Sequence, residues 1–296
     1  MPESRQPEDR VAEAPPSAGG TAHRLRLGLI QMRLEPGQKA RNLRHACGLL
    51  ESAAEGGAQV AVLPEAMPLG WTDPSARQHA EAIPEGETCR ALAEVARRRH
   101  LWICSGLIER ADGQLFNAGV LIDPTGRVVL HHRKIHELAI ATDLYARGDR
   151  LGVADTPWGR VGVMICADAF IEGLVISRTL GAMGARLILS PCAWAVPAGH
   201  DNAREPYGQL WRDSYGPVAR QFRLWIVGVS NVGPIAAGPW AGRRCIGCSL
   251  AVGPDGRPAL QGPYGDAAES ILYLDVTLPP ASAPPPGGGG KRPGRL

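Results

Sequence analysis

The sequence predicts an α/β fold in which helices cover a mixed sheet of parallel and antiparallel strands. Short apolar runs alternate with segments whose apolar residues have helical spacing, and two connections carry hairpin-turn residues. Residues 1–23 and 279–296 are rich in Pro, Gly and other small or charged residues and lack any periodicity. We therefore expect disordered tails at both ends and one domain over residues 24–278.

In the first half of the domain, strands and helices alternate along the chain. Apolar runs predict strands at 25–32, 60–63 and 101–108. Helical spacing predicts helices at 40–54, where Leu43, Ala46 and Leu50 fall on one face, and at 88–99. Strands at 117–122 and 128–132 flank Asp123-Pro124-Thr125-Gly126, a hairpin turn.

The second half continues this alternation. Strands are expected at 161–165, 187–190 and 224–229, and helices at 171–181 and 202–223. Gly216 and Pro217 predict a break in the long second helix. Strands at 249–252 and 270–274 are expected to form a hairpin around Pro254-Asp255-Gly256.

The bulk composition excludes several classes of protein. The net charge of +3 is too small to indicate binding to nucleic acid or to a membrane surface. There are seven cysteines without regular spacing, which predicts reduced, buried thiols in a cytoplasmic protein. No apolar run is long enough to span a membrane, and the acidic N-terminus is not a signal peptide.

Three reactive side chains each stand at or just beyond a strand-like segment. Cys166 follows the apolar run 161–165, Glu65 follows 60–64, and Lys134 ends the basic sequence 131–134. Functional groups of α/β folds gather at the carboxyl ends of strands. A thiol nucleophile needs a base and a positive charge, so we assign Cys166 as nucleophile, Glu65 as base and Lys134 as cation.

The oxyanion formed by attack on an acyl carbon would be stabilised by Lys134 and the backbone N–H of Ala167. Taken singly, each of these residues has a plainer interpretation. A cysteine at a strand end is usually a packed hydrophobe, and a Glu or Lys in such a segment usually faces solvent. The assignment depends on their order, their positions and the residues beside them.

Those neighbouring residues resemble the three signature motifs of the nitrilase superfamily, the carbon–nitrogen hydrolases. The matching segments are 63–66 (Leu-Pro-Glu-Ala), 133–136 (Arg-Lys-Ile-His) and 165–168 (Ile-Cys-Ala-Asp), and weaker matches at 117, 190–194, 231–233 and 247–256 extend the resemblance over residues 24–276. It implies a four-layer αββα sandwich and a Glu65-Lys134-Cys166 triad. It also implies a homodimer or larger homo-oligomer.

The sequence departs from the family at two points. Many members carry a second glutamate after the lysine, before a Gly-Asp pair; counting back from Gly148 gives Asp143, while Glu137 is the other candidate. Many relatives also have an arginine four residues after the cysteine, and here the run from Cys166 to Glu172 lacks it and is one residue shorter. The substrate preferences of well-known branches should therefore not be transferred.

The remaining candidate residues are assigned either to the substrate pocket or to no functional site. His136, Asp168 and Trp194 are expected to line the pocket. His131 and His132 should point to opposite faces of a strand, which argues against a metal site, and the Cys-x-x-Cys at 245–248 has no second pair of ligands. We expect neither a metal nor a cofactor.

The preferred function is hydrolysis of a non-peptide C–N bond in a small linear amide, through a thioester on Cys166. Nitriles and N-carbamoyl compounds are alternative substrates, and an acyltransferase would pass the same thioester to an amine. A non-catalytic binding protein is a third hypothesis, which the intact triad disfavours. The expected partner is a small molecule, with no nucleic acid and no membrane.

Overall fold

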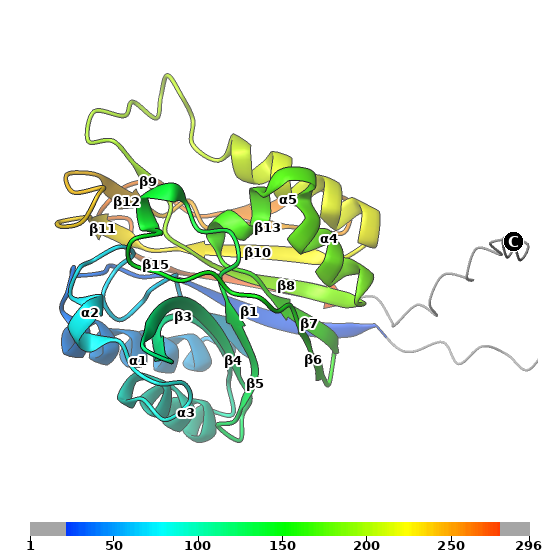
Figure 1. Cartoon of the computed structure of the whole chain (residues 1–296). Helices are drawn as coiled ribbons and strands as arrows, with labels where there is room; N and C mark the ends of the chain where they lie inside the picture. Colours follow the sequence, from blue (N-terminus) through cyan, green and yellow to red (C-terminus); the bar gives the residue numbers. More distant parts are fainter. Residues whose placement is uncertain (1–21, 279–296) are drawn as a thin grey trace, which may run out of the picture.

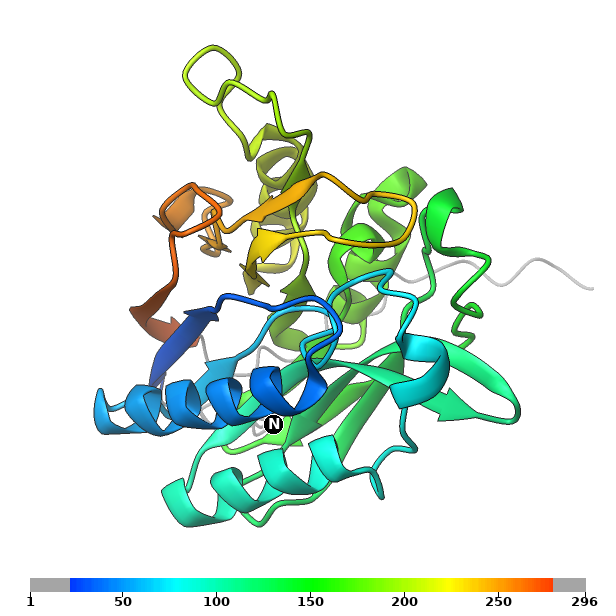
Figure 2. The ribbon, with the colours of Figure 1, turned by 90° about the vertical axis from the view of Figure 1, so that its left-hand side faces the viewer.

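The computed structural model describes residues 22–278, which form two six-stranded sheets packed face to face between helices (Figure 1). Both predicted tails lie outside these residues, apart from Ala22 and His23, and His23 already begins β1. The predicted four-layer αββα sandwich is confirmed. Figure 2 shows the same layers after a quarter turn.

The first sheet has the order β15-β1-β2-β3-β4-β5, and α1 and α3 cover its outer face. Its neighbours pair in parallel from β1 to β3 and antiparallel elsewhere. Its strands and helices are β1 (His23–Gln31), α1 (Lys39–Glu55), β2 (Val60–Val62), α2 (Ala76–His79), α3 (Glu87–Arg99), β3 (Trp102–Ala111), β4 (Gln114–Ile122), β5 (Val128–Arg133) and β15 (Ser270–Leu278).

The second sheet has the order β14-β13-β10-β8-β7-β6, and α4 and α5 cover its outer face. A separate three-stranded sheet has the order β11-β12-β9. The elements are η1 (Ala139–Ala141), β6 (Val153–Thr156), β7 (Gly159–Val163), η2 (Cys166–Phe170), η3 (Glu172–Leu174), α4 (Val175–Ala182), β8 (Ala185–Cys192), β9 (Ala195–Val196), α5 (Gln209–Phe222), β10 (Trp225–Ser230), β11 (Val232–Pro234), β12 (Arg244–Ile246), β13 (Leu250–Val252) and β14 (Pro258–Gln261).

Alternating side chains divide the core into layers. In β8, Leu187 and Leu189 pack between the two sheets, whereas Ile188 points outward to α4 and α5. The same alternation in β2 sends Val60 and Val62 inward and Ala61 toward α1 and α3. Strand side chains alternate with a period of two, so a strand with apolar residues on both faces is buried on both sides.

Two predicted helices differ from the structure at their beginnings. The helix expected at 171–181 starts only at Val175, because Gly173 and Leu174 have φ angles of 70° and 54°. The helix expected at 202–223 starts at Gln209, after Gly208 with a φ of 119°. A positive φ is incompatible with a right-handed helix, so each of these residues fixes the helix boundary.

The predicted break at Gly216 and Pro217 is wrong, and α5 continues through both residues. Tyr215, Val218 and Ala219 are buried on either side of the proline. Packing of these side chains offsets the hydrogen bond that a proline removes from a helix.

The second predicted hairpin is also wrong, because the two strands expected to form it pair with other strands. The turn at 254–256 joins β13 to β14, in which Ala251 lies opposite Leu260. The segment at 270–274 instead belongs to β15, which pairs with β1 in the other sheet. A turn motif identifies the turn itself but not the distant strand that a later segment joins.

None of the helices in the described range 22–278 is both long and apolar enough to cross a membrane.

A glycine in β3 positions the segment that follows β2. A Cβ atom on Gly106 would lie 2.5 Å from Glu65 Cα and 2.7 Å from the Pro64 carbonyl oxygen. Gly106 also donates its backbone N–H to Pro64 at 3.1 Å and accepts one from Met67 at 3.1 Å. The backbone around Glu65 therefore rests directly against β3, and only glycine permits this approach.

We predict that Gly106→Ala destabilises the fold by about 1–3 kcal/mol, since the new methyl group meets backbone atoms rather than a flexible side chain. The matched control is Gly48→Ala in α1, where a Cβ atom would have nothing within 4 Å. That change should stabilise the fold by about 0.5–1 kcal/mol. Urea denaturation measures both; shifts of the same sign would contradict the packing described at Gly106.

Candidate active site

The turn after β7 holds Cys166 in an unusual backbone conformation. Cys166 is the first residue of η2, its φ is +43°, and it is 9% exposed. This left-handed conformation costs a residue other than glycine of order 1–3 kcal/mol, so the surrounding contacts must maintain it. The structure thus presents the thiol from a tight turn at the carboxyl end of a buried strand.

Glu65 and Lys134 form a buried ion pair. Lys134 Nζ lies 2.6 Å from Glu65 Oε1, and each side chain is 1% exposed. Asn117 donates its side-chain Nδ2 to the same oxygen at 2.7 Å. Glu65 Oε2 has no hydrogen-bond partner among residues 22–278. One carboxylate oxygen is therefore fixed, and the other is available to accept a proton.

A second carboxyl group lies beside the lysine. Glu137 Oε2 is 3.7 Å from Lys134 Nζ, and the ring of Trp71 lies 5.3 Å from the same nitrogen. Burial alone would lower the pKa of Lys134, but Glu65 and Glu137 together raise it, so the lysine stays charged. Burial raises the pKa of Glu137 to about 8, against the opposing effect of Lys134. Glu137 is therefore mostly neutral at pH 7.

The surroundings of Cys166 favour the neutral form of its thiol. Burial raises its pKa well above the usual value, and its contact with Cys192 and the charge of Glu65 act in the same direction. The charge of Lys134 lowers the pKa but does not compensate. Nucleophilic attack by Cys166 therefore requires a base that removes the proton as the reaction proceeds.

Asp168 connects the two halves of the site. Its buried carboxylate accepts the backbone N–H groups of Ile165 at 2.9 Å, Ile135 at 3.1 Å and His136 at 2.8 Å. It also contacts His132 Nε2 at 2.8 Å. Burial would raise the pKa of Asp168, but these contacts lower it overall. The ionised carboxylate thereby fixes the loop after Lys134 against the turn that carries Cys166.

Several predicted site residues lie elsewhere than expected. Asp168 and His136 do not line the cavity at Cys166; Asp168 is fully buried, and the His136 ring packs edge-on against Phe170 at 5.8 Å. Asp143 is exposed and contacts Arg77 only through its backbone carbonyl. Of the two candidates for the second carboxylate, only Glu137 lies beside Lys134.

Two neighbouring histidines face opposite ways, as the strand alternation predicted. His131 contacts Glu109 at the surface, and His132 contacts Asp168 in the interior. Within residues 22–278, no cluster of three or more His, Cys, Asp or Glu side chains is arranged to hold a metal ion.

A cavity of about 260 Å³ leads to Cys166. Glu65, Lys134, Ala167 and Trp194 line it, and of the three residues expected at a substrate pocket only Trp194 is among its lining residues. Sequence reasoning missed most of the remaining wall, which comes from distant segments. These additional lining residues are Trp71, Leu138, Phe170, Ala193, Ala195, Tyr207, Leu210, Trp211 and Trp240.

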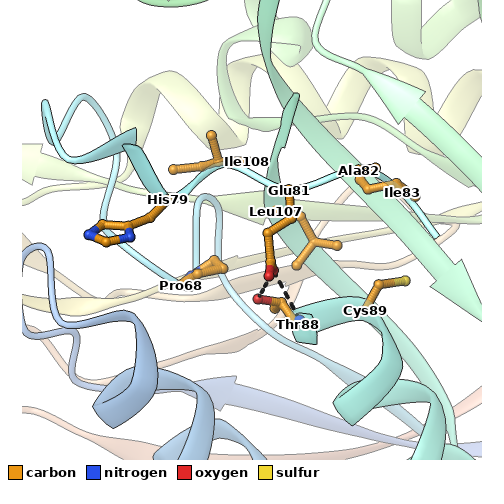
Figure 3. Close-up of a pocket in the computed structure, with 9 residues that line it drawn as sticks. All are labelled: Pro68, His79, Glu81, Ala82, Ile83, Thr88, Cys89, Leu107 and Ile108. Carbon is orange, nitrogen blue, oxygen red and sulfur yellow. Dashed lines mark hydrogen bonds between the residues drawn. The ribbon is translucent and has the colours of Figure 1, made fainter. Parts of the chain in front are cut away.

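A second hollow beside the start of α3 is too small for a substrate. Its volume of about 10 Å³ is no larger than one water molecule requires (Figure 3). Glu81 lies at its wall and accepts the backbone N–H of Thr88 at 3.0 Å and the hydroxyl of the same residue at 2.7 Å. This carboxylate caps the N-terminus of α3.

Comparison with known proteins identifies the family of this chain. A family model described as carbon-nitrogen hydrolase matches residues 26–283. A nitrilase from Pyrococcus abyssi is 31% identical over 235 residues, which cover 78% of this chain and 82% of the relative. The omega-amidase NIT2 of Xenopus tropicalis is 32% identical over 186 residues, 60% of this chain and 66% of the relative. The match thus spans just under two thirds of the omega-amidase.

Solved structures show the same fold. A carbon-nitrogen hydrolase from Helicobacter pylori G27 superposes with a TM-score of 0.75 at 22% identity, over 86% of this chain and 90% of the other. Nit3 from Saccharomyces cerevisiae, a member of the nitrilase superfamily, has a TM-score of 0.73 at 20% identity, over 87% and 90%. The chain therefore belongs to the carbon-nitrogen hydrolase family, within the nitrilase superfamily that its three motifs resemble.

Proposed function

We propose that this protein is a hydrolase that cleaves the C–N bond of a small linear amide through a thioester on Cys166. The observation that carries the proposal is the buried Glu65–Lys134 pair beside a cysteine in one cavity. The relatives support amides as substrates, since several are named omega-amidases and one is an amidase in complex with acrylamide. In that amidase, fluoroacetamide leaves a covalent acetamide adduct on the active-site cysteine.

The first half of the reaction forms the thioester. Glu65 Oε2, which has no partner in the described part of the chain, accepts the thiol proton while Cys166 Sγ attacks the amide carbonyl carbon. Lys134 and the backbone N–H of Ala167 stabilise the oxyanion, and one such donor contributes about 3–4 kcal/mol. The C–N bond then breaks, and the nitrogen leaves as ammonia or amine with the proton that Glu65 held.

The second half returns the enzyme to its starting state. Glu65 accepts a proton from water, whose oxygen attacks the thioester carbonyl. The C–S bond breaks, the carboxylic acid leaves, and Glu65 returns the proton to the Cys166 sulfur. Because the Cys166 thiol is neutral, Glu65 has to accept its proton in the first half, and the same carboxylate accepts the proton of water in the second.

Glu137 positions Lys134 in this proposal. Its carboxyl lies 3.7 Å from the lysine Nζ and is absent from the cavity wall. Glu137 therefore does not touch the substrate and acts on it only by positioning Lys134. A neutral carboxyl at this distance leaves the single negative charge of Glu65 as the ion-pair partner of the lysine. Once Glu65 has accepted the thiol proton, the charge of Lys134 is free to stabilise the oxyanion.

The proposal predicts which compounds release ammonia. Screening amides, N-carbamoyl compounds, ureas and nitriles should give turnover with amides, and Cys166→Ala should remove it by at least about 10³-fold, since no other nucleophile lies at this position. Cys248→Ala is the matched control, because this buried thiol does not line the cavity. Turnover that survives in the Cys166→Ala variant would refute the mechanism.

The pKa of Glu137 predicts a pH-dependent stability. A folded-state pKa raised from 4.5 to about 8 means that the stability contributed by this group is present below pH 4.5 and is lost as pH rises toward 8. Glu137→Gln removes this loss. The Tm of the variant should match that of the wild type near about pH 4 and exceed it increasingly up to about pH 8.

Thermal unfolding followed by circular dichroism across this pH range measures the difference. Asp143→Asn is the control, because this carboxylate is exposed in the same segment and should show no such divergence. A Tm difference for Glu137→Gln that is constant with pH would contradict a buried, neutral carboxyl.

A further inference from the structure

The cavity wall is almost entirely apolar beyond the reacting groups. Apart from Glu65, Lys134 and Cys166, every lining residue is aromatic or aliphatic. Six of them are aromatic: Trp71, Phe170, Trp194, Tyr207, Trp211 and Trp240. Four of the seven tryptophans in the chain thus gather at a single cavity. Such a wall favours the binding of a substrate group that is apolar and planar.

The aromatic side chains contact one another and form a continuous surface. Trp194 stacks on Trp211 with ring centres 4.6 Å apart, and Phe170 meets Trp211 edge-on at 5.5 Å. The indole Nε1 of Trp211 donates to the Tyr207 hydroxyl at 3.0 Å. This bond occupies the indole donor of Trp211, whereas the indole Nε1 groups of Trp71 and Trp194 are buried without a hydrogen-bond partner among residues 22–278. The contacts among Phe170, Trp194 and Trp211 thus form a surface made mainly of rings.

The cavity has no cation left for an anionic substrate group. Lys134 is the only positively charged residue among the described lining residues, and Glu65 already neutralises it at 2.6 Å. The shortened run after Cys166 lacks the arginine that many relatives carry, and Phe170 of this run lines the cavity. A second carboxylate on the substrate would lose its hydration without gaining a partner, which is costly.

The volume sets the size of the apolar group. A cavity of about 150 Å³ holds a benzene molecule. The cavity at Cys166 measures about 260 Å³, which leaves room for one aromatic ring and a short chain to the carbonyl group. Leu210 lines the cavity and is 53% exposed, so the cavity reaches solvent near the start of α5.

We propose that this cavity selects amides whose acyl group carries a neutral aromatic ring on a short alkyl chain, of which 3-phenylpropionamide is the simplest representative. This proposal rests on the proposed amide hydrolysis. The aromatic wall of Phe170, Trp194 and Trp211 contacts the ring, and the chain places the carbonyl carbon at Cys166.

A matched substrate series tests the selection. In 3-phenylpropionamide, propionamide, succinamate and β-alaninamide, the same acyl chain ends in a phenyl ring, a hydrogen, a carboxylate or an ammonium group. We expect kcat/KM for the phenyl compound to exceed each of the others by at least about tenfold. Equal values, or a preference for the carboxylate or ammonium compound, would overturn the proposal.

Variants locate the preference in the wall. Trp211→Leu should lower the ratio of kcat/KM for 3-phenylpropionamide to kcat/KM for propionamide by about tenfold. Trp158→Leu is the matched control, since this tryptophan packs on Trp102 at 5.1 Å and lies outside the cavity wall. Trp240→Leu, at a half-buried position of the same wall, repeats the test should Trp211→Leu fail to fold. If neither cavity variant affects the phenyl compound selectively, the assignment is wrong.

Phe170→Arg adds a positive charge to the cavity wall near Cys166. It should raise kcat/KM for succinamate and lower it for 3-phenylpropionamide, so that the order of the two reverses. An unchanged order in a folded variant would contradict the role of Phe170.

Calorimetric measurement of amide binding to the Cys166→Ala variant tests the proposed substrate class separately from the proposed hydrolysis. If no amide is hydrolysed by the wild type, the proposed function fails, while tighter binding of 3-phenylpropionamide than of succinamate still supports the selectivity of the cavity. If amides are hydrolysed but this variant binds the two compounds equally, the proposed function stands and the proposed substrate class is wrong. If it binds neither compound, the substrate class is also wrong.

Discussion

The buried ion pair between Glu65 and Lys134 determines what the rest of the structure has to provide. Two opposite charges that are each 1% exposed are costly unless their geometry and hydrogen bonds are nearly ideal. The 2.6 Å contact and the hydrogen bond from Asn117 meet this requirement. The segments that follow β2 and β5 must therefore meet Asn117 of β4 within hydrogen-bond distance, and the first sheet, which contains all three strands, holds them there.

Asp168 joins this pair to the nucleophile. Its carboxylate holds the backbone on both sides of the site, at Ile165 before the cysteine and at Ile135 and His136 after the lysine. The left-handed backbone at Cys166 persists because this network fixes the turn around it. Asp168, which the sequence analysis expected in the pocket wall, thus acts in the proposed mechanism only through the backbone that it holds. Its importance for the mechanism lies in positioning, not in contact with a substrate.

Part of this arrangement was accessible from the sequence alone. Apolar runs located most of the long strands, and reactive residues beside such runs identified Glu65, Lys134 and Cys166, because buried strands and strand-end sites leave local patterns. Counting back from Gly148 favoured Asp143 over Glu137, whereas the structure places Glu137 beside Lys134, because the path of the loop between Lys134 and Gly148 decides which carboxylate turns inward. Tyr207 and Trp211 were missed because nothing local indicates that the start of α5 faces Cys166.

The proposed mechanism depends on a covalent bond between the substrate acyl group and Cys166. Acid quenching of the wild-type enzyme during turnover of the best amide, followed by peptide mass spectrometry, measures this bond directly. The proposed mechanism predicts an added mass equal to that of the acyl group on the peptide that contains Cys166. Hydroxylamine should remove this adduct, as it removes thioesters. Turnover without any adduct under these conditions, or an adduct confined to another residue such as Cys192, would contradict it.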